Sequence, residues 1–167
     1  VDSSKPGIYV LRYERSDGSG NRSETVTRTV IVRDTRLPLI TILGDGNMVM
    51  EAGEEYLDLG ASWFDLVDGN GTLTGVGEVL GLVPGEYEVR YEFTDSSGNE
   101  AQPKTRIVRV LDRSAPHLEL NGLAESIHPV GEPYVDPGAN WFDLVDGNGT
   151  VFAEGTADWN VLGERVL

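Results

Sequence analysis

The feature that most constrains the fold of this chain is an internal repeat. Shifted by 78 positions, the sequence matches itself without a gap. The decapeptide WFDLVDGNGT at residues 63–72 recurs unchanged at 141–150, and residues 6–14 return in similar form at 84–92. Self-similarity at a fixed spacing is the signature of a repeat architecture. The chain is therefore expected to consist of copies of one folding unit.

Two prolines set the boundaries of that unit. Pro38 and Pro116 lie 78 positions apart, and each comes four residues after an aspartate, Asp34 or Asp112. The residue before a proline is held in an extended conformation. We therefore expect a complete repeat over residues 38–115. Residues 1–37 would be the C-terminal half of a preceding repeat, and residues 116–167 the N-terminal part of a third, within a longer tandem array.

The hydrophobic pattern within the repeat has a period of two rather than 3.6. Residues 86–93 and 105–111 alternate polar and apolar side chains, as half-buried strands do. Further strands are expected over 39–43, 57–64 and 72–80, separated by clusters of Gly, Asp, Asn and Pro. The sequence thus predicts an all-β protein of tandem Ig-like β-sandwich repeats, with a tyrosine corner at Tyr87.

A series of motifs carries a resemblance to a known family. The chain resembles a bacterial Ig-like repeat of the type grouped with the C-terminal repeats of an insecticidal crystal protein, and it is similar to hyalin repeats. That resemblance implies tandem spacers on secreted enzymes, adhesins and other surface proteins, without catalytic activity. Family members commonly read Asp-Gly-Asp where this chain has Asp68-Gly69-Asn70. The motifs are Gly53-Glu54-Glu55-Tyr56, Asp58-x-Gly60-Ala61, Asp65-x-x-Asp68-Gly69, Pro84-Gly85-x-Tyr87, Asp95-x-x-Gly98-Asn99 and Thr105-Arg106-x-Val108-x-Val110-x-Asp112.

Charge and composition exclude several classes of function. The chain has 28 acidic and 13 basic residues and a net charge of -15. Such a field repels phosphate, so neither a general nucleic-acid binder nor an anionic-membrane binder is expected. Every uninterrupted apolar run is far shorter than the about 20 residues that a helix needs to span a bilayer. The absence of cysteine excludes disulfides and thiolate metal sites.

The acidic residues have two interpretations. They could form a soluble, self-repelling surface with Asx-turns, or they could supply oxygen ligands to calcium, although no full EF-hand pattern is present. In the expected sandwich, the loop at 65–72, the loop at 95–99 and the linker before Pro38 meet at one end. No cofactor other than calcium is suggested. The candidate ligands are Asp34, Asp65, Asp68, Asn70, Asp95 and Asn99 at one junction, and Asp112, Asp143, Asp146 and Asn148 at the next.

Three tripeptides match the N-glycosylation sequon, at Asn21, Asn70 and Asn148. A tight Asn-Gly turn is the alternative reason for the recurrence of the second and third. Catalysis has little support, because His117 and His128 have Leu39 and Met50 at the equivalent positions of the complete repeat. No nucleophile elbow or zinc signature occurs, so an enzyme is not expected. Trp63 and Trp141 are expected to be core or partly buried residues rather than sugar-stacking platforms.

Two functions remain. The first is a non-catalytic structural repeat of an extracellular stalk, adhesin or filament, whose partners are neighbouring repeats of the same chain. The alternative is a carbohydrate- or surface-binding accessory module of a secreted enzyme, which would contact a glycan or a host surface through a row of exposed aromatic rings. Both place the chain outside the cell or at the cell surface. Because residues 1–37 and 116–167 are complementary halves of a repeat, we expect either that the parent chain continues as a longer array or that a second copy docks head to tail.

Overall fold

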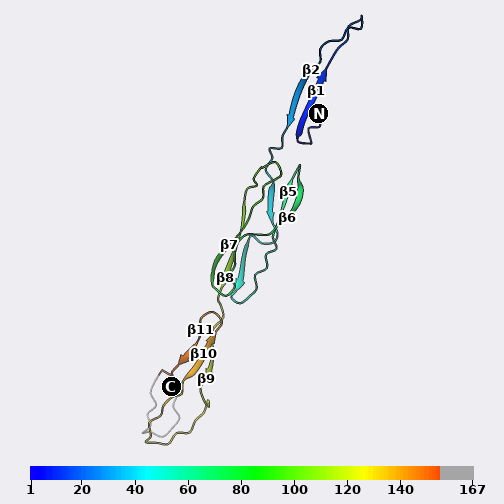
Figure 1. Cartoon of the computed structure of the whole chain (residues 1–167). Helices are drawn as coiled ribbons and strands as arrows, with labels where there is room; N and C mark the ends of the chain where they lie inside the picture. The colour runs from blue at the N-terminus through cyan, green and yellow to red at the C-terminus, as the bar shows by residue number, and fades with distance from the viewer. Residues whose placement is uncertain (155–167) are drawn as a thin grey trace. The chain divides into compact units, whose positions relative to one another are not determined.

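The computed structural model describes residues 1–154, which contain eleven β-strands and no helix (Figure 1). The protein is therefore all-β over this range, as the alternating hydrophobic pattern predicts. None of these residues belongs to a helix that could cross a membrane.

The first two strands form an antiparallel hairpin. Strand β1 (Gly7–Tyr13) pairs with β2 (Val26–Val32) in a register that places Gly7 opposite Val32 and Tyr13 opposite Val26. At the start of this hairpin the hydroxyl of Tyr9 donates a hydrogen bond to the carbonyl of Lys5 at 2.9 Å. This is the tyrosine-corner geometry, at the position equivalent to Tyr87.

The following strands form two three-stranded sheets. One has the order β3-β5-β6, with strands Leu39–Ile42, Ala61–Asp65 and Gly69–Leu73, and the other has the order β4-β8-β7, with strands Asn47–Glu51, Lys104–Leu111 and Gly85–Tyr91. Two sheets that alternate inward apolar and outward polar side chains give the sandwich expected of an Ig-like domain.

The last described strands resemble the first of these sheets. Strands β9 (His117–Leu120), β10 (Ala139–Asp143) and β11 (Gly147–Val151) have the order β11-β10-β9, which corresponds to the order β6-β5-β3. Their first residues are the sequence equivalents of Leu39, Ala61 and Gly69, with which β3, β5 and β6 begin. In the same way, β7 and β8 begin at the equivalents of the first residues of β1 and β2. Equivalent residues thus start equivalent strands along the described chain.

The contacts divide the chain into two compact units. The first contains residues 1–48, 57–79 and 87–108, and its core includes the buried side chains of Ile40, Ala61, Val89, Tyr91 and Val108. The second contains residues 49–56, 80–86 and 109–167, and its described core includes Met50, Val110 and Asp143. This division does not follow the expected boundaries at 38 and 115, which stay a prediction.

The largest differences from expectation concern strands β6, β5 and β4. Strand β6 begins at Gly69, within the expected turn, and ends at Leu73 instead of 80. Gly69 takes the left-handed conformation (φ +90°) that closes a short hairpin loop, so pairing starts there at once. Strand β5 begins at Ala61 rather than 57, because Gly60 (φ +77°) interrupts the extended backbone. Strand β4 was not expected, since its methionines give no β-branched signal.

Candidate metal sites

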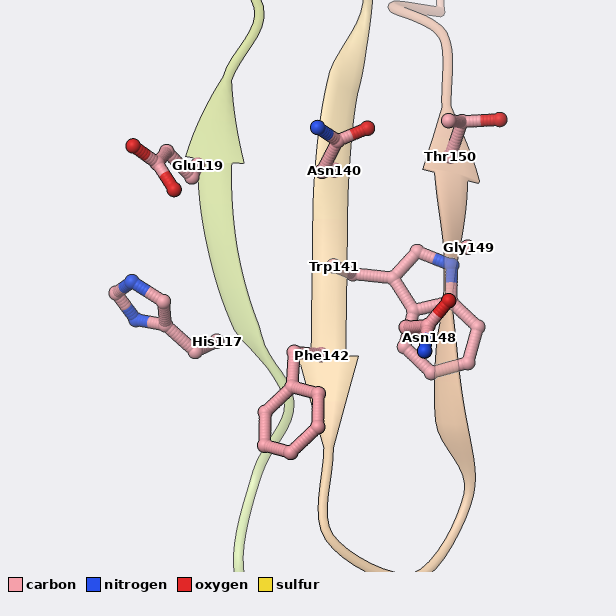
Figure 2. A pocket seen from close by; sticks show the side chains of 8 residues that line it. All are labelled: His117, Glu119, Asn140, Trp141, Phe142, Asn148, Gly149 and Thr150. Carbon is pink, nitrogen blue, oxygen red and sulfur yellow. The ribbon is translucent and has the colours of Figure 1, made fainter.

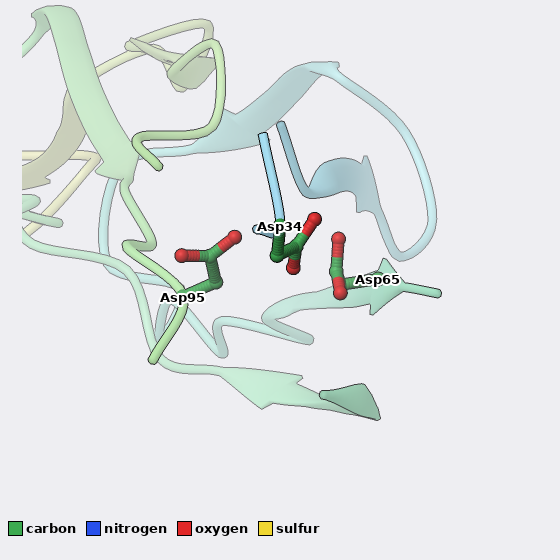
Figure 3. Close-up of side chains that lie close together, drawn as sticks. All are labelled: Asp34, Asp65 and Asp95. Atoms are coloured by element: carbon green, nitrogen blue, oxygen red, sulfur yellow. The ribbon is translucent and has the colours of Figure 1, made fainter. Parts of the chain in front are cut away.

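Three carboxylates from separate parts of the sequence meet at one end of the first unit. Asp34 lies between β2 and β3, Asp65 ends β5, and Asp95 follows β7. Each offers a carboxylate oxygen, and these oxygens lie within 4.8 Å of one another. Figure 3 shows the carboxylate of Asp34 between those of Asp65 and Asp95. We call this group the linker cluster.

The hairpin loop between β5 and β6 positions Asp65. Its Oδ1 accepts hydrogen bonds from the backbone N–H groups of Val67 at 2.7 Å and Asp68 at 3.0 Å. The residue is only 2% exposed. No donor among the described residues reaches its second oxygen, Oδ2, so one half of this carboxylate has no hydrogen bond.

The turn at 95–99 positions Asp95, which is 6% exposed. Its Oδ1 accepts the backbone N–H groups of Ser97 at 2.9 Å and Asn99 at 2.8 Å, and its Oδ2 accepts the Asn99 amide at 2.8 Å. Burial by itself raises the pKa of Asp95, but the hydrogen bonds from Asn99, Ser97 and Gly98 outweigh it and hold the pKa below its ordinary value. Asp95 is therefore present as a carboxylate.

Asp34 brings the linker to these two residues. Its Oδ1 accepts the backbone N–H of Arg36 at 3.1 Å, while its carbonyl oxygen accepts the amide of Asn99 at 3.4 Å. Its Oδ2 is fully enclosed and has no hydrogen-bond partner among the described residues. A buried polar atom without a partner costs free energy, so this oxygen indicates a ligand that the protein itself does not provide.

A second acidic group lies in the second unit. Asp112, Asp143 and Asp146 again offer oxygens within 4.8 Å of one another. Asp143 is buried, and its Oδ1 accepts the backbone N–H groups of Val145 at 2.8 Å and Asp146 at 2.9 Å. Asp112 accepts the N–H of Ser114 at 3.2 Å. Asp65 and Asp34 make the same hydrogen bonds at the equivalent positions of the sequence.

Four of the other candidate ligands lie outside these clusters. Asp68 accepts the backbone N–H of Ser96 at 2.6 Å and its hydroxyl at 2.7 Å, which holds the two loops together. Asn99 directs its amide N–H group, not its oxygen, at Asp95 and Asp34. Asn70 and Asn148 are exposed on β6 and β11.

The three sequon asparagines are all exposed. Asn21 donates its side-chain amide to Asp17 at 2.9 Å. Asn70 and Asn148 lie opposite Phe64 and Phe142 in their hairpins. Accessibility is necessary for glycosylation but also usual for a hairpin strand, so it leaves both interpretations open.

An ion pair between the buried Arg106 and the partly buried Asp58, elsewhere in the first unit, was missed by the sequence analysis. Asp58 accepts hydrogen bonds from the guanidinium of Arg106 and the hydroxyl of Tyr91, both at 2.5 Å, and from the backbone N–H groups of Gly60 and Gly75, both at 3.0 Å. Arg106 is 1% exposed and also donates to the carbonyls of Leu43 and Asp45. A cation at an inward position of an alternating strand, recurring as Arg28, is the signal that could have revealed this pair.

The two recurring tryptophans are packing residues, as expected. Trp63 stacks on Phe93 with ring centroids 4.0 Å apart. In the last sheet the ring of Trp141 lies against Gly149, beside an open groove of about 500 Å³ (Figure 2). His117, Glu119 and Asn140 line the groove together with exposed Phe142. Neither His117 nor Glu119 hydrogen-bonds another described side chain, so this groove contains no assembled acid–base pair.

The sandwich, its tyrosine corner and its paired hairpins define an Ig-like module. Residues 40–110 match the model of the family described as "Bacterial surface protein, Ig-like domain". This segment is thus similar to bacterial surface Ig-like domains, and the resemblance stated from the motifs is confirmed. Domains of this family are typically non-catalytic.

Two further similarities accompany the family match. Over 135 residues the chain is 29% identical to Hyalin from Strongylocentrotus purpuratus, an alignment that covers 75% of this chain and 11% of Hyalin. Among solved structures, it is similar to a lipoprotein from Bacteroides thetaiotaomicron, at 24% identity and a TM-score of 0.40, over 47% of this chain and 40% of that one. The chain therefore spans only a small part of the curated relative and less than half of the solved one.

Proposed function

We propose that this chain is part of a stalk or filament on the cell surface, built from tandem Ig-like repeats that separate other parts of a protein. The observation that carries this proposal is the return of equivalent strands, in the same order, further along the chain. A spacer requires only that each unit buries its own core and joins the next. The family match to a bacterial surface domain supports a location outside the cell.

Contacts between successive repeats support the same function. Within the complete repeat, the backbone N–H of Arg113, just before the boundary at 115, donates to Glu51 at 2.6 Å and so fixes the start of the linker. The side chain of Leu144 lies so close to Gly53 that a Cβ there would be 2.5 Å from it. Leu144 belongs to the expected third repeat and Gly53 to the complete one. Packing of this kind limits the freedom of the linker between them, as a stalk requires.

The hairpin β1–β2 suggests how chains could associate. Tyr13 and Arg28 occupy the positions of Tyr91 and Arg106, and the guanidinium of Arg28 lies 6.0 Å from the ring of Tyr13. Yet Tyr13 is 47% exposed where Tyr91 is 0% exposed. Asp136, the counterpart of Asp58, accepts the backbone N–H of Ala153 at 3.2 Å. We infer that the hairpin face receives the first half of its own repeat, either from a preceding part of the same protein or, head to tail, through Asp136 of a second copy.

The alternative is a glycan- or surface-binding module. One observation favours it: Phe64 and Phe142 are 55% and 57% exposed at equivalent positions on two sheets. A flat exposed ring is a surface on which a sugar could stack. However, each of these described sheets presents a single ring of this kind rather than a row, so the spacer function is the better supported of the two.

Retention of the 167-residue chain on a panel of immobilised polysaccharides separates the two functions. A spacer predicts the same low retention for the natural chain and for the double variant Phe64→Ala, Phe142→Ala. Retention of the natural chain that the double variant loses would establish the binding module instead. A variant with the similarly exposed Leu66→Ala and Leu118→Ala changes controls for general loss of apolar surface.

A further inference from the structure

We propose that the linker cluster of Asp34, Asp65 and Asp95 is a calcium site that fixes the linker to the following repeat. The site goes beyond the spacer function, since a stalk could exist without it. The cluster also contains more than acidic residues in proximity, because Oδ2 of Asp34 is fully enclosed and has no hydrogen-bond partner among the described residues.

The unpaired oxygens are the observation that points to a ligand. Oδ2 of Asp34 is fully enclosed, and Oδ2 of the 2% exposed Asp65 accepts no hydrogen bond from any described residue. By contrast, both oxygens of Asp95 accept hydrogen bonds within their own turn. An enclosed carboxylate oxygen without a donor is costly unless its charge is paired or it coordinates a metal.

Mutual repulsion strengthens the inference. Three like charges with oxygens within 4.8 Å repel one another, and burial removes the water that would screen them. Among the described residues, no Lys or Arg side chain forms an ion pair with any of the three. A bound divalent cation would offset this repulsion, because it attracts all three carboxylates.

The chemistry of the donors selects the kind of cation. All three side chains are carboxylates, and neither His117 nor His128 belongs to a cluster within the described part of the chain. Oxygen-only coordination with several carboxylates is typical of calcium, whereas zinc and copper favour nitrogen and sulfur. Magnesium demands near-ideal octahedral coordination and retains several of its water ligands. Three ligands from three separate segments suit this strict geometry less well than the flexible coordination of calcium.

The second cluster provides an internal comparison. Asp112 and Asp143 repeat the positions and hydrogen bonds of Asp34 and Asp65. The position equivalent to Asp95 lies beyond residue 167, and the third carboxylate among the described residues is Asp146. In the linker cluster the equivalent of Asp146, Asp68, is instead bound to Ser96. In the 167-residue chain we therefore expect the linker cluster to be the tighter calcium site, because its three ligand segments are all present and held by hydrogen bonds.

Calorimetric titration of the 167-residue chain with calcium chloride tests the proposal. Extracellular modules bind calcium with Kd on the order of 10⁻⁴–10⁻³ M, so the titration must reach about 10 mM. We expect saturable binding, and a higher melting temperature in calcium than in chelator. Asp34→Asn should weaken the tighter site about tenfold or more, because it removes one charged ligand but keeps the Oδ1 acceptor of the Arg36 turn.

Asp45→Asn is the matched control, since it makes the same charge change on an exposed residue outside both clusters. It should leave calcium affinity unchanged. The proposal is overturned if the natural chain shows no saturable heat and melts alike in calcium and chelator. It is equally overturned if Asp34→Asn binds as the natural chain does, or if both variants lose affinity to the same extent. Asp95→Asn provides a second test should Asp34→Asn fail to fold.

Discussion

At the scale of single residues, the recurring decapeptide is explained by packing. In both copies the glycine of the Asn-Gly-Thr sequence lies against the indole of a tryptophan across the hairpin. A Cβ on Gly71 would lie 2.6 Å from Nε1 of Trp63, and one on Gly149 would lie 2.7 Å from Nε1 of Trp141. The glycine of this sequon therefore has a structural reason to recur, whether or not the asparagine carries a sugar.

Replacing Gly71 by alanine should therefore destabilise the protein. The added methyl group has to displace an indole that already stacks on Phe93, and overpacking of this kind costs about 1–3 kcal/mol. Chemical denaturation with tryptophan fluorescence measures the change. Gly46→Ala is the matched control, because nothing lies within 4 Å of a Cβ at that position. Equal stability of the two variants would contradict this account of the decapeptide.

At the scale of elements, most of the strands could be predicted, but the ion pair between them could not. Alternation identified β7 and β8 because one face is buried and the other exposed, and this gives a local period. Strand β6 begins at Gly69 instead of the expected residue 72, because the turn between β5 and β6 is short. The length of a turn depends on backbone geometry, which the hydrophobic pattern does not report. The Asp58–Arg106 contact joins residues that are 48 positions apart, and such pairing appears only once the sheets are assembled.

The acidic loops were partly predictable for the same reason. Linker and loops were placed at one end by strand order, and the structure does bring Asp34, Asp65 and Asp95 together. The sequence could not show that Ser96 binds Asp68 or that Asn99 turns its N–H group toward Asp95. These outcomes depend on side-chain rotamers in the finished turns.

The Asp58–Arg106 ion pair makes the free energy of unfolding depend on pH. Burial by itself raises the pKa of Asp58, but hydrogen bonds from Tyr91, Gly60 and Gly75 and the charge of Arg106 together hold it below the ordinary value of 3.8. The folded state thus binds this proton less readily than the unfolded state. The stabilisation is complete above the ordinary pKa and is lost as pH falls from about 4 through the folded pKa.

We therefore expect the natural chain to lose stability as pH falls below about 4, and Asp58→Asn to lose less over that range while being less stable at neutral pH. Tyr91→Phe keeps the guanidinium and removes one hydrogen bond to the carboxylate, so it should show an intermediate slope. Urea denaturation at a series of pH values measures these slopes. Parallel curves for the natural chain and Asp58→Asn would show that the pair does not contribute.

At the scale of the whole molecule, association should follow from the exposed hairpin face. Light scattering should give a mass that rises with protein concentration. Arg28→Asp should suppress that rise, because it places two acidic residues opposite each other in the proposed contact between copies. Adding Asp136→Arg to the same chain reverses both charges and should restore association. A mass that is the same for all three proteins would reject the head-to-tail contact.

The central claim is that residues 38–115 form one complete repeat of a tandem structural array. Its most direct test is the thermal unfolding of that segment alone, followed by circular dichroism and calorimetry. Because the segment contains both three-stranded sheets and the Asp58–Arg106 pair, we predict a β-type spectrum and a single reversible transition whose calorimetric and van't Hoff enthalpies agree. A segment without a cooperative transition, or with the spectrum of an unfolded chain, would contradict the claim.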